Sequence, residues 1–309
     1  MQTNSNSLAP SSRVATLAIA ALCLVWGSTW LVIKGGLRDL PPQTSGAARF
    51  WIAGAVMGVL VRTIGRREGG DAPPTWLWLS LGALNFGVSY AIVYRTAALL
   101  PSGLTSLLWG VFPMLSAAVG HLFLPGERLA QRQWSGFALG LVGLAVLFAT
   151  DLRALGPEAA PAAAVLLLSP ISSVVGNTLV KRHGAKVSSL ALNRNAMLVG
   201  AALLTLVAAL TESDATPRWT PAAIGSVLYL ALMGTVFTFG LYYWLLRYVR
   251  SSRLSLIAYV TPAIALTLGA TLGDERMSWS IAGGAAAILA GIVLVVRNPA
   301  PAAPAAQKP

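Results

Sequence analysis

The sequence predicts an all-α integral membrane protein in which ten transmembrane helices form two inverted five-helix repeats. Three observations lead to this fold class. Of the 309 residues, 56% are hydrophobic and only 10% are charged, whereas soluble domains average about 25% charged residues. The charges are clustered, which leaves ten long and mainly apolar runs. A recognisable copy of residues 102–129 also returns at residues 251–277.

Each apolar run has about the length, roughly 20 residues, that a membrane-spanning helix needs. Two of the runs hold one arginine each, Arg49 and Arg194, and the others hold no charged residue. The expected spans are residues 14–33, 40–61, 72–94, 104–124, 133–150, 159–180, 187–211, 219–246, 254–273 and 277–296. Because five helices is an odd number, a second repeat of five must run in the opposite direction to the first.

The duplication divides the chain into two halves with short polar ends. Pro113 matches Pro262 at the same offset as the surrounding residues, and a repeat of this length decides architecture. Most of the 22 lysines and arginines fall on the side that carries both ends of the chain, so the positive-inside rule places both termini in the cytoplasm. The expected units are a disordered cytoplasmic tail at residues 1–13, a first repeat at 14–150, a second at 159–297 and a disordered cytoplasmic tail at 298–309.

The first expected helix carries small polar residues between two tryptophans, as Trp26, Ser28, Thr29 and Trp30. Trp26 and Trp30 are four residues apart and share one helix face. This pattern is typical of a helix that faces a substrate cavity, and an interfacial aromatic belt explains it equally well. Both interpretations stay open at this point.

Arg49 is the least expected residue of the first half. A charge at mid-membrane costs about 2.5–3.5 kcal/mol on insertion scales and marks a candidate functional site. Arg49 lies only about two turns into its helix, so its side chain could instead extend toward the membrane surface as an anchor. Arg194 occupies the corresponding helix of the second half.

Polar aromatic residues recur at matched places in the third and eighth helices. The third helix carries Asn85, Tyr90 and Tyr94, and the eighth carries Tyr243 and Trp244. Such residues suit a pocket for a small amphipathic solute. An aromatic belt would explain Tyr94 and Tyr243 as well, whereas the amide of Asn85 needs partners inside hydrocarbon.

The fourth and ninth helices each contain a proline after an aromatic residue. Trp109 precedes Pro113, and Tyr259 precedes Pro262. A proline inside a spanning helix removes a hydrogen bond and bends the axis, so we expect two hinges beside the cavity. Asn177 in the sixth helix completes the expected cavity lining.

The fifth and tenth helices are rich in small residues, which favours close helix packing and a scaffold role. Glu127 and Glu275 directly precede these helices. A carboxylate near a helix N-terminus interacts favourably with the helix dipole. We therefore interpret both glutamates as structural residues.

The sequence lacks the residues that most enzymes and pumps require. Every aspartate and glutamate falls at a helix end or in a loop, and Cys23 is the single cysteine. His121 and His183 show no metal-ligand spacing, and there is no phosphate-binding Walker loop. We expect no catalytic activity, no metal, no cofactor, no ATP and no nucleic acid. A packing role suits a lone histidine such as His121.

Several motifs resemble those of one transporter family. They are Trp-Gly-Ser-Thr-Trp at 26–30, Leu-Pro-Ser-Gly at 100–103, Gly-Glu-Arg-Leu at 126–129 and Asp-Glu-Arg-Met at 274–277. In this order they resemble the EamA-type branch of the drug/metabolite transporter (DMT) superfamily. The resemblance implies two inverted repeats, cytoplasmic termini, and a central cavity lined mainly by helices 1, 3, 4, 6, 8 and 9. Pro170 in the sixth helix departs from the pattern of the first helix.

These observations favour a secondary transporter in the cell (inner) membrane. We expect an exporter or exchanger of a small metabolite such as an amino acid, working by alternating access. Its expected partners are the small-molecule substrate and the lipid bilayer, and we expect a monomer or weak dimer. The alternatives are a membrane enzyme or sensor that transports nothing, and a passive channel.

Overall fold

A computed structural model describes residues 11–123, 129–249, 254, 257–275 and 278–296 of the chain. A few side chains inside the helices, including those of Tyr243 and Tyr259, lie outside this description. The described residues form helices, with one isolated parallel bridge between Asp71 and Val187.

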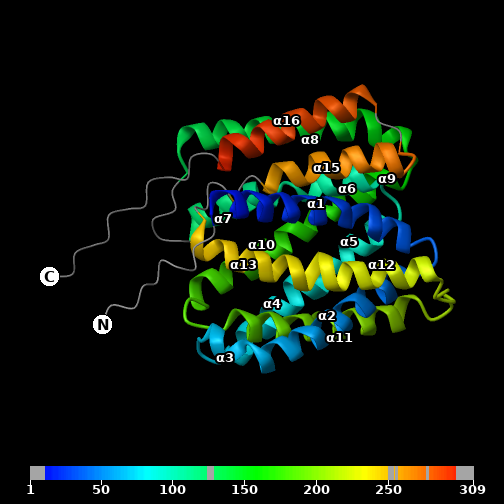
Figure 1. Ribbon diagram of the computed structural model, residues 1–309. Helices are drawn as coiled ribbons and strands as arrows, with labels where there is room; N and C mark the ends of the chain where they lie inside the picture. The colour runs from blue at the N-terminus through cyan, green and yellow to red at the C-terminus, as the bar shows by residue number, and fades with distance from the viewer. Residues whose placement is uncertain (1–10, 124–128, 250–253, 255–256, 276–277, 297–309) are drawn as a thin grey trace.

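The helices follow one another with short connections (Figure 1). In chain order they are α1 (Ser12–Gly36), α2 (Pro42–Thr63), α3 (Gly65–Glu68), α4 (Thr75–Leu81), η2 (Gly82–Val88), α5 (Ser89–Ala97), α6 (Ser102–Trp109), α7 (Phe112–Phe123), α8 (Gln131–Ala154), α9 (Ala159–Leu166), α10 (Leu168–His183), α11 (Ser189–Thr211), α12 (Pro221–Ala231), η3 (Leu232–Phe237), α13 (Thr238–Tyr248), α15 (Ile257–Leu272) and α16 (Trp279–Val296).

Local sequence explains where several helices begin. The hydroxyl of Ser11 accepts a hydrogen bond from the amide of Val14 at the start of α1. Thr220 caps α12 in the same way, and Pro221 occupies its first position. Pro42 begins α2, as the prolines at 41 and 42 predict, because proline tolerates the first helical turn.

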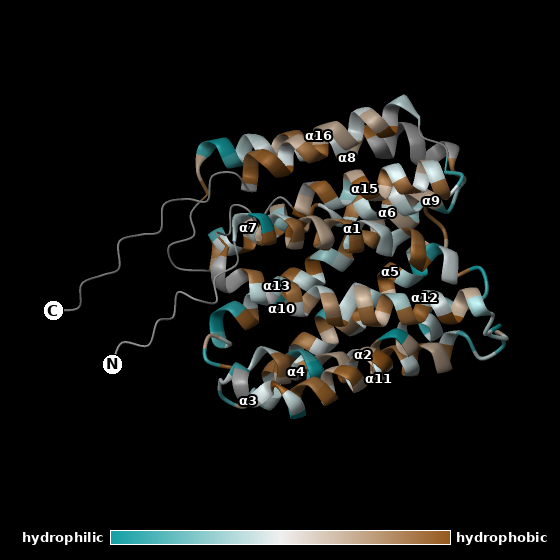
Figure 2. Cartoon of the chain, in the orientation of Figure 1, coloured by the Kyte–Doolittle hydropathy of each residue, from teal (hydrophilic) through white to brown (hydrophobic). Residues whose placement is uncertain are grey.

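Seven helices of the described residues are long and apolar enough to cross a membrane. They are Ser12–Gly36, Pro42–Thr63, Thr75–Ala97, Ser102–Phe123, Ala159–His183, Ser189–Thr211 and Pro221–Tyr242, and the shorter apolar helices are Val260–Leu272 and Ile281–Val295. Figure 2 shows hydrophobic residues along the lengths of the helices and hydrophilic residues mainly toward the loops. The all-helical membrane fold is confirmed, and ten crossings in two inverted repeats stay a prediction.

Four of these apolar helices are interrupted near their middles. The segments η2 and η3 are π-helices inserted between α-helical parts. Residues 110–111 separate α6 from α7, and Leu167 separates α9 from α10. Isolated π-turns often occur at functional sites, so these irregularities indicate where function is to be sought.

Two helix pairs form opposite sides of the molecule (Figure 1). On one side α8 packs along α16, and on the other α2 packs along α11. A Cβ at Gly143 would lie 2.7 Å from the carbonyl oxygen of Gly284, and one at Gly291 would lie 2.6 Å from that of Gly136. These glycines let the backbones approach closely, which confirms the predicted packing of the fifth and tenth helices.

Two glutamates cap α2 and α11 reciprocally. Glu212, at the end of α11, accepts hydrogen bonds from the backbone amides of Gln43 at 2.7 Å and Thr44 at 2.9 Å at the start of α2. Glu68, at the end of α3, contacts the first amides and hydroxyls of α11, including the amide of Ser189 at 3.1 Å. Each carboxylate satisfies amides that a helix start leaves unpaired.

Glu275 plays the same part for α6. It accepts hydrogen bonds from the amides of Ser102 at 2.6 Å and Gly103 at 3.2 Å. A capping role is therefore correct for Glu275, but its expected helix was wrong, because α16 instead begins with the hydroxyl of Ser278. Glu127 lies outside the described residues.

Candidate functional site

Arg49 lies inside the protein with 2% of its surface exposed. Its Nε donates to the hydroxyl of Thr235 at 3.0 Å and its Nη2 donates to the carbonyl of Gly234 at 3.3 Å. The guanidinium carbon lies 5.0 Å from the ring centre of Tyr90 and 5.2 Å from that of Phe50, within the range of cation–π attraction. The side chain therefore points into the interior and does not extend to the membrane surface.

Aromatic rings surround this guanidinium on one side. Phe50 lies edge-on to Tyr90, with ring centres 4.7 Å apart, and to Phe86 at 5.3 Å. Phe86 also contacts Phe239 at 6.3 Å, and Tyr90 contacts Tyr94 at 6.3 Å. The residues that meet here, called the Arg49 cluster, are Arg49, Phe50, Phe86, Tyr90, Tyr94, Thr235 and Phe239.

Both π-helices contribute to the Arg49 cluster. Phe86 belongs to η2, and Gly234 and Thr235 belong to η3. The hydroxyl of Thr235 donates to the carbonyl of Leu230, five residues earlier, while it accepts from Arg49. The irregular turn of η3 thus presents a hydroxyl and a carbonyl to the arginine.

Two buried polar groups near the cluster have no hydrogen-bond partner. The hydroxyl of Tyr94, which is fully buried, lies near Arg49 without making a hydrogen bond of normal length. The amide oxygen of Asn85 in η2 is also unpaired and faces Gly176 of α10. Unpaired buried groups are costly in a membrane interior, so they call for a functional explanation.

A second polar group joins α5, α10 and α6. The hydroxyls of Ser89, Ser169 and Ser173 form a chain, with Ser89 2.8 Å from Ser169 and 2.9 Å from Ser173. The indole nitrogen of Trp109 donates to Ser169 at 3.1 Å, and its ring lies 6.1 Å from that of Trp30. We call these residues the serine–tryptophan group.

The polar and aromatic residues near the middle of α1 contact α12 and the Arg49 cluster. Ser28 shares a hydrogen bond of 2.7 Å with the hydroxyl of Tyr229 in α12. Thr29 is buried and donates to the carbonyl of Trp26. The ring of Trp26 contacts Phe239 at 6.3 Å, which joins α1 to the Arg49 cluster.

Other predicted residues are not brought into these groups. Trp244 is half-buried against the apolar cluster around the start of α1, and Asn177 is exposed on α10. The side chains of Tyr243 and Tyr259 lie outside the described residues. Tyr242, like Phe239, belongs to α13 and contacts Trp26, with ring centres 5.7 Å apart, and sequence reasoning did not select it.

The two predicted hinge prolines differ in their local structure. Pro113 follows the interruption between α6 and α7, whereas Pro262 lies inside the unbroken α15. The ring of Pro262 packs on Gly110, where a Cβ would lie 3.2 Å from it. Pro262 thus contacts the irregular turn at residues 110–111, and Pro113 directly follows that turn.

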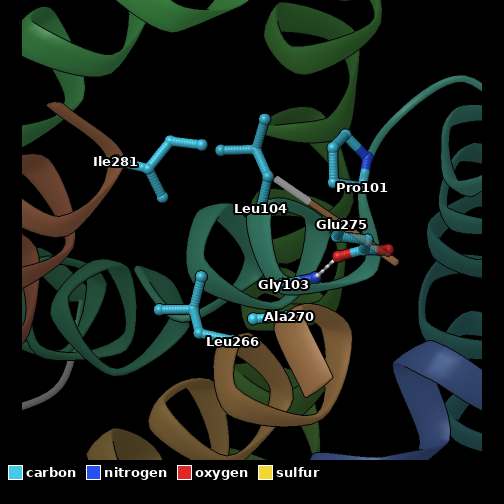
Figure 3. A pocket seen from close by; sticks show the side chains of 7 residues that line it. All are labelled: Pro101, Gly103, Leu104, Leu266, Ala270, Glu275 and Ile281. Carbon is cyan, nitrogen blue, oxygen red and sulfur yellow. Dashed lines mark hydrogen bonds between the residues drawn. The ribbon is translucent and has the colours of Figure 1, made fainter. Parts of the chain in front are cut away.

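A small pocket lies apart from the predicted cavity residues, between α6, α15 and α16 (Figure 3). Leu104, Leu266, Ala270 and Ile281 make it mainly apolar, and Glu275 lies at its edge. Lys34 lies 3.7 Å from the carboxylate of Glu275 and donates to the carbonyl of Leu100 at 2.8 Å. The Lys34–Glu275 pair therefore links the end of α1 to the segment after α15 beside this pocket.

The described helices form a membrane bundle with a buried polar and aromatic centre, as a membrane transporter of a polar solute requires. The profile of the EamA-like transporter family matches residues 13–149 and again residues 160–297. The chain belongs to this family. Its partners are accordingly a small-molecule substrate and membrane lipid, and it is a transporter and not an enzyme.

Individual relatives agree with this membership. The chain is 26% identical to "Uncharacterized transporter YoaV" of Bacillus subtilis over 90% of this chain and 95% of that protein. It is 28% identical to "Uncharacterized inner membrane transporter YedA" of Escherichia coli K12 over 84% and 83%. It is 27% identical to "Probable amino-acid metabolite efflux pump" of Salmonella typhimurium over 88% and 91%.

A solved structure described as "Crystal structure of protein" has the same fold. It matches with a TM-score of 0.66 and 23% identity, and the match covers 92% of this chain and 98% of that chain. This similarity supports the helical arrangement alone.

Proposed function

We propose that this chain is a secondary transporter that exports or exchanges a small metabolite by alternating access. The observation that carries the proposal is the composition of the Arg49 cluster. Arg49, Phe86 and Tyr90 come from the first segment that matches the family, and Thr235 and Phe239 come from the second. A site built between two repeats is exposed to either side when the repeats move relative to each other.

The proposed topology is ten transmembrane helices in two inverted five-helix repeats, with both termini in the cytoplasm. Its support is the double match of the family profile at residues 13–149 and 160–297. The excess of lysine and arginine on the side of the termini supports the orientation. We propose the cell (inner) membrane as the location and a monomer or weak dimer as the assembly.

The proposed cavity lining includes Trp26, Ser28, Thr29, Trp30, Arg49, Asn85, Tyr90, Tyr94, Trp109, Asn177, Tyr243, Trp244 and Tyr259. Contacts of the Arg49 cluster and the serine–tryptophan group support many of these residues. Pro113 and Pro262 are the proposed hinges, supported by the contact between Pro262 and Gly110 beside the interruption of α6 and α7.

Counterflow in proteoliposomes tests this function. Vesicles with purified protein are loaded with one unlabelled amino acid, organic acid, nucleoside or sugar, and uptake of the same labelled solute is followed. A carrier gives transient, saturable accumulation above the equilibrium level, which protein-free vesicles do not show. A channel gives only equilibration, and absence of counterflow across the whole panel would contradict the proposal.

A further inference from the structure

The guanidinium of Arg49 has no anionic partner among the described residues. Its contacts are the hydroxyl of Thr235, the carbonyl of Gly234 and the rings of Phe50 and Tyr90. These neutral groups solvate the charge but leave it uncompensated. A buried cation normally pairs with an anion.

Four of the described acids are engaged at helix ends, and four others, Asp71, Glu158, Asp214 and Asp274, are exposed. Asp39 binds Arg218 at 2.6 Å. Glu68, Glu212 and Glu275 cap α11, α2 and α6. An anion for Arg49 therefore has to come from outside these residues.

Unpaired hydroxyls lie beside the same guanidinium. Tyr94 is fully buried, and its hydroxyl lies near Arg49 and Ser45 without making a hydrogen bond of normal length to either. The hydroxyl of Ser45 is likewise buried and unpaired. The hydrogen bonds to Thr235 and Gly234 use only some of the five N–H groups of the guanidinium. The site thus combines free donors with an excess positive charge.

These donors match a carboxylate. A carboxylate has two oxygens that accept several hydrogen bonds, and a guanidinium can bind both oxygens at once. The rings of Phe50, Phe86, Tyr90 and Phe239 offer an apolar wall next to that position. The described residues of the Arg49 cluster include no aspartate or glutamate that could bind an ammonium group of the substrate.

We propose that Arg49 binds the carboxylate of the transported solute, and that this solute is a small organic acid with net negative charge and an apolar or aromatic body. The inference rests on the proposed transport function and names its substrate class. Tyr94 and Ser45 add hydrogen bonds to the carboxylate, and the rings of the Arg49 cluster contact the apolar body. In this structure the cluster is closed, so the solute enters when the surrounding helices separate.

Ligand binding by the unmodified protein gives the first test. Thermal shift and competition measurements compare 3-phenylpropionate with its neutral amide, with phenethylamine and with phenylalanine. Since a hydrogen-bonded ion pair contributes about ten- to a hundredfold to affinity, 3-phenylpropionate should bind at least about tenfold more tightly than the amide and the amine, and more tightly than the zwitterion. Equal affinity for the acid and its amide would overturn the proposal.

Variants test the role of Arg49 itself. R49Q should weaken 3-phenylpropionate binding by about ten- to a hundredfold, and R49K, which keeps the charge but not the planar fork, should lose less. R194Q is the matched control, because Arg194 occupies the corresponding α11 and bonds only to the neighbouring Asn195 in the described structure. Its affinity should stay within about twofold of the unmodified protein, because the hydrogen bonds of Arg194 in the described structure go to Asn195 and not to a residue of the Arg49 cluster.

A purely structural role for Arg49 gives a different result. Folded R49Q would then be less heat-stable but would bind 3-phenylpropionate with unchanged affinity, which would overturn the proposal. Should R49Q not fold, Y94F keeps the ring and removes only the unpaired hydroxyl. Several-fold weaker binding of the acid by Y94F, with unchanged binding of the amide, supports the proposal, and equal effects on both ligands contradict it.

The same vesicles separate this inference from the transport proposal. Counterflow of other solutes without preference for carboxylates would leave the transport function standing and refute the role of Arg49. Arg49-dependent binding of 3-phenylpropionate without counterflow of any solute would support the role of Arg49 in binding and refute the transport function.

Discussion

The contact between α8 and α16 predicts opposite effects for two Gly→Ala substitutions in α16. A Cβ at Gly291 would lie 2.6 Å from the carbonyl oxygen of Gly136 and 2.9 Å from the amide nitrogen of Gly140. Ordinary contacts begin at 3.4 Å, so the two helices would have to separate by about 0.8 Å. A Cβ at Gly283 meets nothing within 4 Å.

The magnitudes follow from packing and helix propensity. Overpacking costs about 1–3 kcal/mol, and alanine gains up to about 1 kcal/mol over glycine inside a helix. G291A should therefore lower the free energy of unfolding by about 1–2 kcal/mol, whereas G283A should raise it by about 0.5–1 kcal/mol. Both variants add the same methyl group to the same helix, so each is the control for the other.

Reversible unfolding in mixed detergent micelles, followed by circular dichroism, measures this difference. The expected gap between the two variants is about 1.5–3 kcal/mol. G136A places a Cβ 2.8 Å from the carbonyl oxygen of Gly291 and should resemble G291A. Equal stability of G291A and G283A would refute the close backbone contact.

Two further predictions concern the hinges and the caps. P113A and P262A should slow counterflow more than they reduce folded protein. Alanine at 113 adds an amide next to the interruption between α6 and α7, and alanine at 262 restores a helix hydrogen bond inside α15 and removes the ring that packs on Gly110. Flux per folded molecule measures this effect, and equal losses of flux and folded protein would contradict it. E212Q should lower the free energy of unfolding by about 1–2 kcal/mol by weakening the cap of α2. D214N, at an exposed neighbour, should change it by less than about 0.5 kcal/mol; equal effects would rule out the cap.

The sequence was sufficient to predict the helical membrane fold and the family. Long apolar runs are local signals, and the recurrence of the Pro113 region around Pro262 needs no structure to be seen. The helix starts at Pro42 and Pro221 also carry local signals, because proline suits the first turn of a helix. Close packing of α8 and α16 was expected from the glycine spacing in both, but only the structure shows that they pack against each other.

Which face of a helix points inward was harder to predict. In a soluble protein the polar face of a helix shows its orientation, but lipid is as apolar as a protein core, so this signal is weak. Tyr242 and Tyr243 are adjacent and chemically equal, and only the structure shows Tyr242 against Trp26. Asn177 is polar within a span yet exposed, whereas Ser169 and Ser173 are buried.

The partners of Arg49 could not be found from sequence. Arg49 is conspicuous as a charge within an apolar run, but Thr235 is one of several threonines in such runs. The Thr235 hydroxyl reaches Arg49 because η3 is a π-helix. No distinctive residue pattern marks the place where backbone hydrogen bonds change from the four-residue spacing of an α-helix to the five-residue spacing of a π-helix. The partner helix of Glu275 was missed because a carboxylate in a loop can reach a helix distant in sequence.

The reciprocal caps of α2 and α11 bear on how the chain is assembled during synthesis. Gln43 and the carboxylate of Glu212 that binds its amide are 169 residues apart in sequence. The ribosome therefore delivers α2 to the membrane long before the group that completes its first turn has been made. Glu68, by contrast, is already in place when α11 emerges. The hydrogen bonds between Glu212 and the start of α2 can therefore form only after the second half of the chain has been made and has packed against the first.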